Sequence, residues 1–214
     1  MNMYTKLTEN GHGVVAILRG TAFDDALGCV EAFATAGIRG IEVTFNTPGA
    51  PAIIEELVRR HPDLVIGAGT ALTVDDVVKA AGAGAKFILS PDTNPAVIAA
   101  TKLRGLLSVP GAYTATEVLA AVRAGADIVK IFPAGAAGAS YIKDLLGPLS
   151  GFRFMAVGGV SLENTASFFK AGAISVGIGG QLVDKKLIEA KDWKGLQNLA
   201  ARFLEEARKG RESK

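Results

Sequence analysis

Two charged residues lie within otherwise apolar stretches of the sequence, and they are the first candidates for chemistry. Lys130 lies in Ile-Val-Lys-Ile-Phe-Pro (residues 128–133), and Glu42 lies in Gly-Ile-Glu-Val-Thr (residues 40–44). Burial removes water from a lysine ammonium and lowers its pKa, so a neutral amine becomes available near pH 7. Lys130 is therefore our candidate nucleophile for an imine, or Schiff base, with a ketone.

Glu42 is the matching candidate for proton transfer. A carboxyl group beside an amine can take up and return the protons that imine formation and carbon–carbon cleavage require, provided its pKa is raised towards neutrality. Two other interpretations stay open at this point. Lys130 could extend to solvent or pair with a carboxylate purely to fill space, and Lys130 and Glu42 could form a buried ion pair without chemistry.

Two further residues end apolar runs where a substrate could be bound. Arg19 ends the run 14–19, and its planar guanidinium could bind a carboxylate or a phosphate. Thr70 ends the run 64–70 directly after Gly69, where a ligand can approach the backbone. Arginine is also common at surface strand ends, and threonine also suits a strand end or a helix cap.

The last two apolar runs each lead into a pair of glycines. Gly158-Gly159 ends one run, and Gly179-Gly180 follows the other. Barrel enzymes often bind phosphate at these two positions with bare backbone N–H groups and a helix N-terminus. We predict a phosphate site there, with tight turns as the alternative explanation for the glycines.

Eight β-type runs recur along the chain, and helical patterns separate them. Most runs are continuously apolar, which is typical of parallel strands covered on both faces. The runs span residues 14–19, 40–45, 64–70, 87–90, 106–109, 128–132, 154–159 and 174–178. The helical patterns between them span residues 23–36, 50–60, 74–81, 95–102, 116–124, 140–146 and 161–171.

The ends of the helical patterns are marked as well. An Ala-Gly pair, at Gly37, Gly84, Gly125 and Gly172, precedes the next run, and glycine accepts the left-handed conformation that ends a helix. Side-chain oxygens at Thr73 or Asp75, at Thr114 or Thr116, and at Ser161 mark helix starts.

Strand and helix repeated eight times predict a (β/α)8 TIM barrel. We expect one domain over residues 1–214, with a short N-terminal helical segment and a C-terminal helix at about 193–207 followed by a charged tail. A doubly wound open sheet is the rival, and it is disfavoured because no Gly-x-Gly-x-x-Gly follows the first run. In a barrel, catalytic groups lie at the carboxyl ends of strands.

Composition excludes several classes of protein. The chain has 214 residues, 49% of them hydrophobic, and its 26 glycines have no collagen period, so neither a fibre nor a disordered chain is expected. Lys and Arg number 23 against 21 Asp and Glu, which indicates no nucleic-acid partner. No run reaches the roughly 18 apolar residues of a membrane span, so we expect no membrane association and a cytoplasmic location.

The scarce cysteine and histidine residues indicate neither a disulfide nor a metal site. Cys29 is the only cysteine, and its apolar helical surroundings predict a buried thiol. Neither His12 nor His61 has a Cys or acidic cluster at ligand spacing, and neither lies where a serine nucleophile would need a base. We expect no metal and no other cofactor.

Taken together in this order, six motifs resemble the bacterial 2-keto-3-deoxy-6-phosphogluconate aldolase family. They are Glu42-Val43-Thr44, Gly67-Ala68-Gly69-Thr70, Ser90-Pro91, Val109-Pro110-Gly111, Val129-Lys130-Ile131-Phe132-Pro133 and Val157-Gly158-Gly159-Val160. The resemblance spans about residues 14–183. It implies a metal-free class I aldolase with a (β/α)8 barrel, a homotrimer, that splits phosphorylated 2-keto-3-deoxy sugar acids into pyruvate and glyceraldehyde 3-phosphate.

The resemblance also implies roles for individual residues. Lys130 would form the imine and Glu42 would be the general acid and base, while Thr70 and Pro91 would line the pyruvate site. The phosphate would lie among Gly158, Gly159, Gly179 and Gly180.

Two positions depart from the family pattern. Gluconate-type members have arginine where this chain has Asn46, so Arg19 becomes the candidate for binding the carboxylate, a combination that resembles the galactonate-type branch. Gln181 stands where some members have a phosphate-binding serine. Two alternative functions stay open: another phosphate-binding barrel enzyme, an epimerase or a synthase, with Lys130 as acid or base, and a non-catalytic trimeric scaffold.

Overall fold

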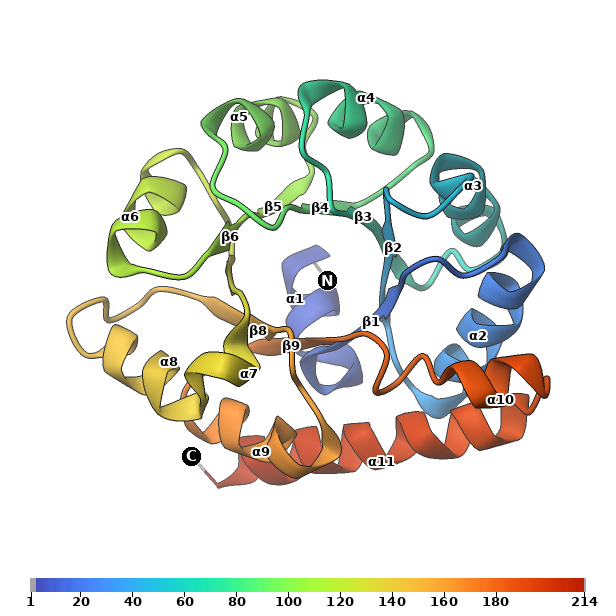
Figure 1. Cartoon of the computed structure of the whole chain (residues 1–214). Coiled ribbons are helices and arrows are strands. Elements are labelled where there is room, and N and C mark those ends of the chain that lie inside the picture. Colours follow the sequence, from blue (N-terminus) through green and yellow to red (C-terminus); the bar gives the residue numbers. More distant parts are fainter. Residues whose placement is uncertain (1–2, 214) are drawn as a thin grey trace.

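The computed structural model describes residues 3–213 and shows a ring of parallel strands surrounded by helices (Figure 1). The strands are β1 (Val14–Leu18), β2 (Gly40–Thr44), β3 (Val65–Gly69), β4 (Phe87–Leu89), β5 (Leu107–Val109), β6 (Gly111–Ala112), β7 (Val129–Ile131), β8 (Phe154–Val157) and β9 (Ser175–Ile178). Their order in the sheet is β5-β4-β3-β2-β1-β9-β8-β7-β6, and β1 pairs in parallel with both β2 and β9.

The ninth strand arises because one barrel position is divided. β5 pairs with β4, β6 pairs with β7, and only Pro110 separates the two segments. Proline has no backbone N–H and interrupts a ladder, while its carbonyl oxygen still accepts a hydrogen bond from the Lys130 N–H at 2.8 Å. The ring therefore has the eight positions of a (β/α)8 barrel, and the predicted fold is confirmed.

Helices follow the strands around the outside of the ring (Figure 1). They are α2 (Phe23–Ala36), α3 (Ala50–Arg60), α4 (Val74–Gly82), α5 (Pro95–Leu103), α6 (Ala115–Arg123), α7 (Ala134–Ala137), α8 (Ala139–Leu146), α9 (Leu162–Lys170), α10 (Lys185–Glu189) and α11 (Trp193–Glu212). Two short helices, α1 (Met3–Thr8) and η1 (Asn10–Gly13), precede the first strand. The short helices α7 and α10 were not predicted, because five residues or fewer give no legible 3.6-residue period.

The helix ends follow the expected signals. Thr73 and Thr114 each accept a hydrogen bond from the backbone N–H three residues on, and Asp76 and Glu117 complete the two capping boxes. All four glycines of the Ala-Gly pairs have positive φ, from 87° at Gly84 to 112° at Gly172.

The C-terminal helix is longer than the sequence predicts, because its charged end is held by pairing rather than left as a tail. Arg208 pairs with Glu205 and Glu212, each about one turn away along the helix. The Arg211 guanidinium donates to the backbone carbonyls of His12 and Ile174 at 2.9 and 2.5 Å. The helix therefore continues to Glu212 and ties the end of the chain to the N-terminal end of the barrel.

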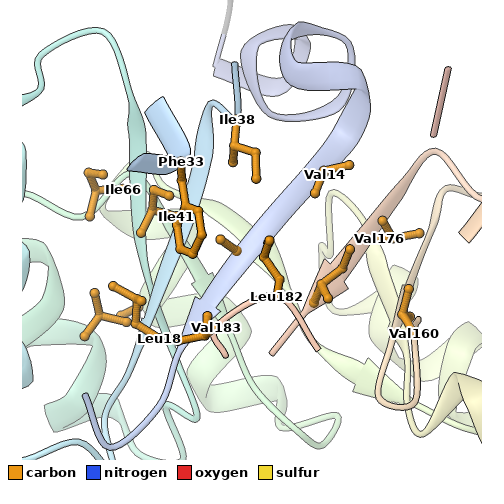
Figure 2. Packing of buried hydrophobic residues seen from close by; sticks show 14 of the residues in the cluster. Val14, Leu18, Phe33, Ile38, Ile41, Ile66, Val160, Val176, Leu182 and Val183 are labelled. Carbon is orange, nitrogen blue, oxygen red and sulfur yellow. The ribbon is translucent and has the colours of Figure 1, made fainter. Parts of the chain in front are cut away.

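The core has two layers. The outer layer lies between the strands and the helices, and Figure 2 shows part of it, including Val14 and Leu18 of β1 and Phe33 of α2. The inner layer fills the barrel with ten buried apolar residues: Leu7, Val15, Ile17, Val65, Phe87, Leu89, Val109, Ile128, Met155 and Val157. Leu7 comes from α1, which lies across the ring in Figure 1 and closes one end of it.

Alternation along the strands decides which side chains enter the barrel. Ile41 and Val43 belong to the outer layer, so Glu42 between them faces inward. Val129 and Ile131 belong to the outer layer as well, so Lys130 also faces inward. Both charged side chains predicted from the sequence therefore point into the barrel.

Two other sequence features can be compared with the structure. Cys29 is buried in α2 as predicted, and burial raises the pKa of its thiol to about 12. No helix within residues 3–213 is long and apolar enough to cross a membrane.

Candidate active site

The Glu42 side chain is enclosed at the inner face of β2. It is 1% exposed, and Gly69 on the adjacent strand β3 leaves the space that the carboxylate occupies. A Cβ on Gly69 would lie 1.7 Å from Glu42 Oε1, while Glu42 Oε2 has no hydrogen-bond partner among the described residues. Burial raises the pKa of Glu42, although the positive charges of Lys130 and Arg19 act in the opposite direction.

Lys130 lies at the inner face of β7 and is 5% exposed. Its Nζ lies 4.7 Å from the centroid of the Phe132 ring. Phe132 follows Lys130 by two residues, so both side chains point to the same side of the sheet. Burial lowers the pKa of Lys130, and the positive charge of Arg19 lowers it further, against the opposing effects of Glu42 and Asp92. The environment thus favours the neutral amine that an imine-forming lysine requires.

Glu42 and Lys130 influence each other's pKa without direct ion-pair contact. A buried ion pair is stable only when its geometry is close and its remaining hydrogen-bonding positions are filled. Here Glu42 Oε2 has no partner within residues 3–213. The geometry therefore does not favour the interpretation in which the two residues pair purely to fill space.

Arg19 follows β1 at the carboxyl end of the barrel and borders a cavity of about 600 Å³. Ile17 of the inner layer, Gly20 and Thr21 line the cavity beside it, as do Gly179 and Gly180 from the loop after β9. The Arg19 side chain is exposed, and its charge acts on both Glu42 and Lys130. A negatively charged group in this cavity would lie beside the positive charges of Arg19 and Lys185.

Thr70 and Pro91 stand at the ends of β3 and β4. Thr70 has a φ of 55°, an unfavourable conformation for a β-branched residue and one that occurs mostly where a functional site imposes it. Pro91 lies against β6, because a Cβ on Gly111 would be 2.3 Å from the Pro91 carbonyl oxygen. Gly111 is the strand partner of Lys130, so Pro91 lies against the strand position next to Lys130.

The two glycine pairs occupy different environments. At Gly179 and Gly180 an added Cβ would meet nothing within 4 Å, so their backbone is open towards the cavity beside Arg19. Gly158 and Gly159 have φ values of 85° and 73°, and an added Cβ on either would lie 3.0 Å from its neighbour, the Phe132 ring or Gly135. The structure therefore brings the first pair to Arg19, and the second pair accommodates the turn after β7.

Some residues of the site lack a signal in the sequence. Gly69 makes room for a carboxylate on another strand, and the position of Asp92 near Lys130 depends on the loop after β4. The even spacing of Thr44 from Glu42 could have shown that Thr44 shares the inner face of β2. Within residues 3–213, no group of three or more His, Cys, Asp or Glu side chains could hold a metal ion.

The fold and the site together define a (β/α)8-barrel enzyme that has an amine and a carboxyl group buried inside the barrel. The family model for KDPG and KHG aldolase matches residues 6–199. The chain belongs to this aldolase family, as its motifs predicted.

Individual relatives agree with this assignment. The chain is 40% identical over 171 residues to the probable 2-dehydro-3-deoxy-6-phosphogalactonate aldolase of Rhizobium meliloti, covering 79% of this chain and 81% of the relative. It is similar to a native KDPGal structure, with a TM-score of 0.87 and 35% identity over 93% of this chain and 96% of the other.

A second solved structure bears on the chemistry. KDPG aldolase of Legionella pneumophila, with pyruvate captured as a covalent carbinolamine intermediate, has a TM-score of 0.86 and 27% identity, covering 94% of this chain and 97% of that one. The predicted class, a Schiff-base-forming class I aldolase, is thereby confirmed. The epimerase or synthase and the non-catalytic scaffold are no longer needed to explain the site.

We predict that removing both buried charges stabilises the protein. The Glu42→Gln/Lys130→Met double variant should have a free energy of unfolding higher than that of the parent by about 1 to 4 kcal/mol at pH 7. Burial raises the pKa of Glu42 and lowers that of Lys130 relative to the unfolded chain, and each of these shifts lowers the stability of the folded state at pH 7. Denaturant titration measures the difference. The exposed pair Lys79→Met/Asp75→Asn is the control and should leave stability nearly unchanged. A double variant less stable than its parent would contradict the prediction.

Proposed function

We propose that the protein cleaves a 2-keto-3-deoxy-6-phospho sugar acid, of the gluconate or galactonate series, into pyruvate and glyceraldehyde 3-phosphate in the cytoplasm. The observation that carries the proposal is Lys130, a buried amine of lowered pKa that faces the barrel interior together with Glu42. The names of the relatives, which act on such acids, support the choice of substrate.

The first half of the reaction forms an imine. The neutral Lys130 Nζ attacks the C2 carbonyl carbon, and the carbonyl oxygen takes up a proton to give a carbinolamine. Glu42, whose protonated form is favoured by burial, donates the proton with which the hydroxyl leaves as water. The product is a positively charged iminium between Lys130 and C2.

The second half breaks the carbon–carbon bond. The Glu42 carboxylate removes the proton of the C4 hydroxyl, the C3–C4 bond breaks, and its electron pair moves into the iminium, which becomes an enamine. Glyceraldehyde 3-phosphate leaves with the new aldehyde at the former C4. The enamine takes a proton at C3, and water then hydrolyses the resulting iminium, which releases pyruvate and restores Lys130.

The remaining residues hold the substrate in this scheme. Arg19 binds the C1 carboxylate. Asn46, at the position where gluconate-type members have arginine, has no charge with which to bind it. Thr70 and Pro91 line the pyruvate portion. The phosphate lies against the bare backbone of the loops after β8 and β9, which contain Gly158, Gly159, Gly179 and Gly180.

We predict that borohydride added with pyruvate fixes one reduced pyruvate adduct on Lys130. Peptide mass spectrometry locates the adduct, which Lys130→Ala should lack and Lys102→Ala, a control at an exposed lysine on α5, should retain. The trapping rate should rise with pH around a midpoint below the ordinary lysine value of about 10.4, because the pKa of Lys130 is lowered. An adduct missing from the folded parent protein would refute the mechanism.

We further predict that the galactonate-type epimer is the preferred substrate. Support comes from the combination of Arg19 with Asn46 and from the 40% identity to a probable phosphogalactonate aldolase. Steady-state kcat/KM for the two C4 epimers measures the preference. Arg19→Ala should raise KM for both epimers alike, since their carboxylates are the same. A higher kcat/KM for the gluconate-type epimer would contradict the prediction.

We also propose that the protein is a homotrimer, as its family resemblance implies. Large apolar side chains are exposed on the neighbouring helices α4 and α5 and just before α4, and they support self-association. They are Leu72, Val74, Val78 and Leu103, between 43% and 85% exposed. Light scattering should give about three times the chain mass of 22.1 kDa. Val78→Lys should lower that mass, whereas Thr35→Lys on α2 should not, and a monomeric parent protein would overturn the proposal.

A further inference from the structure

The turn that follows β2 is bonded to the end of β1 through two threonine hydroxyls. Thr44 and Thr47 are 0% and 3% exposed, and the Thr47 N–H donates to the Thr44 carbonyl oxygen at 2.8 Å. This turn brings the two hydroxyl oxygens to 3.1 Å from each other. Asn46 lies at its exposed tip, so the turn offers hydroxyl groups rather than a charge to the inside.

The two hydroxyls hold the backbone on both sides of Arg19. Thr44 Oγ1 donates to the Leu18 carbonyl oxygen at 3.2 Å, and Thr47 Oγ1 accepts from the Gly20 N–H at 2.9 Å. Because Thr44 Oγ1 donates to Leu18, the Thr47 hydroxyl is left to donate to Thr44 Oγ1. One chain of hydrogen bonds therefore runs from Gly20 through both threonines to Leu18.

The residue held in this way points towards the site. Ile17 belongs to the inner layer and Leu18 to the outer layer, so alternation directs Arg19 to the same side as Ile17. Ile17 and Arg19 both line the cavity of about 600 Å³. In the register of β1 with β2, Leu18 lies opposite Val43, which places Arg19 beside Thr44.

The Arg19 side chain has no ion pair with any residue in the described part of the chain, although its charge acts on Glu42 and Lys130. A long side chain without a partner is aimed chiefly by the position of its own backbone. We propose that Thr44 and Thr47 are positioning residues that aim the Arg19 guanidinium at the substrate carboxylate. The inference deepens the proposed function, because it rests on Arg19 as the carboxylate-binding group.

Thr47→Val tests the proposal with little change of shape. The variant leaves the Gly20 N–H without its acceptor and breaks the chain of hydrogen bonds, so we expect KM for the keto acid to rise about 5- to 20-fold with kcat within about 2-fold. Thr47→Ser restores the hydroxyl and should return KM to near the parent value. Borohydride trapping on Lys130 should require a higher concentration of pyruvate in Thr47→Val than in the parent protein. With acetone, a ketone without a carboxylate, the two proteins should require the same concentration.

A double-substitution cycle with Arg19→Ala shows whether Thr47 acts through Arg19. If it does, Thr47→Val raises KM in the parent protein but not in the Arg19→Ala background. Thr101→Val, which removes a buried hydroxyl that donates to the Val97 carbonyl on α5, is the control and should leave KM unchanged. Thermal melting of each variant checks that it is folded.

The outcomes separate the two hypotheses. Three results would overturn the positioning role: an unchanged KM in Thr47→Val, an equal rise in KM in the parent and Arg19→Ala backgrounds, or a loss of trapping with acetone as large as that with pyruvate. The aldolase mechanism would still stand in each case if pyruvate is trapped on Lys130 of the parent protein. Failure of pyruvate to be trapped on Lys130 in the folded parent protein would overturn both. If Thr47→Val does not fold, Thr44→Ser and Thr44→Val take its place, with the same rise in KM expected only for the valine.

Discussion

Space inside the barrel is the constraint on which the site depends. A barrel of eight strand positions has a narrow interior, and large side chains fit into it only if some inward-facing residues have no side chain. Glycines occupy such positions next to the large inward-facing side chains. Gly67 faces the Phe87 ring, Gly177 faces Met155, and Gly69 faces the Glu42 carboxylate, each at a distance that a Cβ would make impossible or very tight. The narrow interior thus explains the glycines at these inward-facing positions, and it agrees with the small share of aromatic residues, 7%, because it is filled by a few large side chains and two charged ones.

The same confinement sets the electrostatics. Desolvation disfavours the charged form of both groups, so it raises the pKa of Glu42 and lowers that of Lys130. Each shift provides the form that imine chemistry needs, a carboxyl group able to donate a proton and an amine able to attack. This burial lowers the stability of the fold, because Glu42 Oε2 has no hydrogen-bond partner within residues 3–213 and the Lys130 Nζ lies over the face of Phe132, 4.7 Å from the ring centroid.

The sequence was sufficient for features that depend on local pattern. Continuous apolar runs and Ala-Gly helix ends predicted the eight strand positions, and a charge inside such a run identified Lys130 and Glu42. It was insufficient where a residue acts on another strand. Gly69 is required by a side chain 27 positions earlier, and the different environments of Gly158-Gly159 and Gly179-Gly180 depend on which loops approach each other. The register between strands and the contacts between loops depend on the three-dimensional structure, and short motifs at the strand ends do not determine them.

If Arg19 binds the substrate carboxylate as proposed, it connects substrate binding with the protonation of the site. Its positive charge lowers the pKa of Lys130 and of Glu42. Without a bound carboxylate this effect helps to keep the amine neutral and opposes the protonation of Glu42. A carboxylate bound to the guanidinium would cancel much of that positive charge, and the pKa of Glu42 would rise just when a proton donor is needed to expel water from the carbinolamine. A single arginine, held at a fixed place on the rim, can therefore favour the nucleophile before binding and the acid after it.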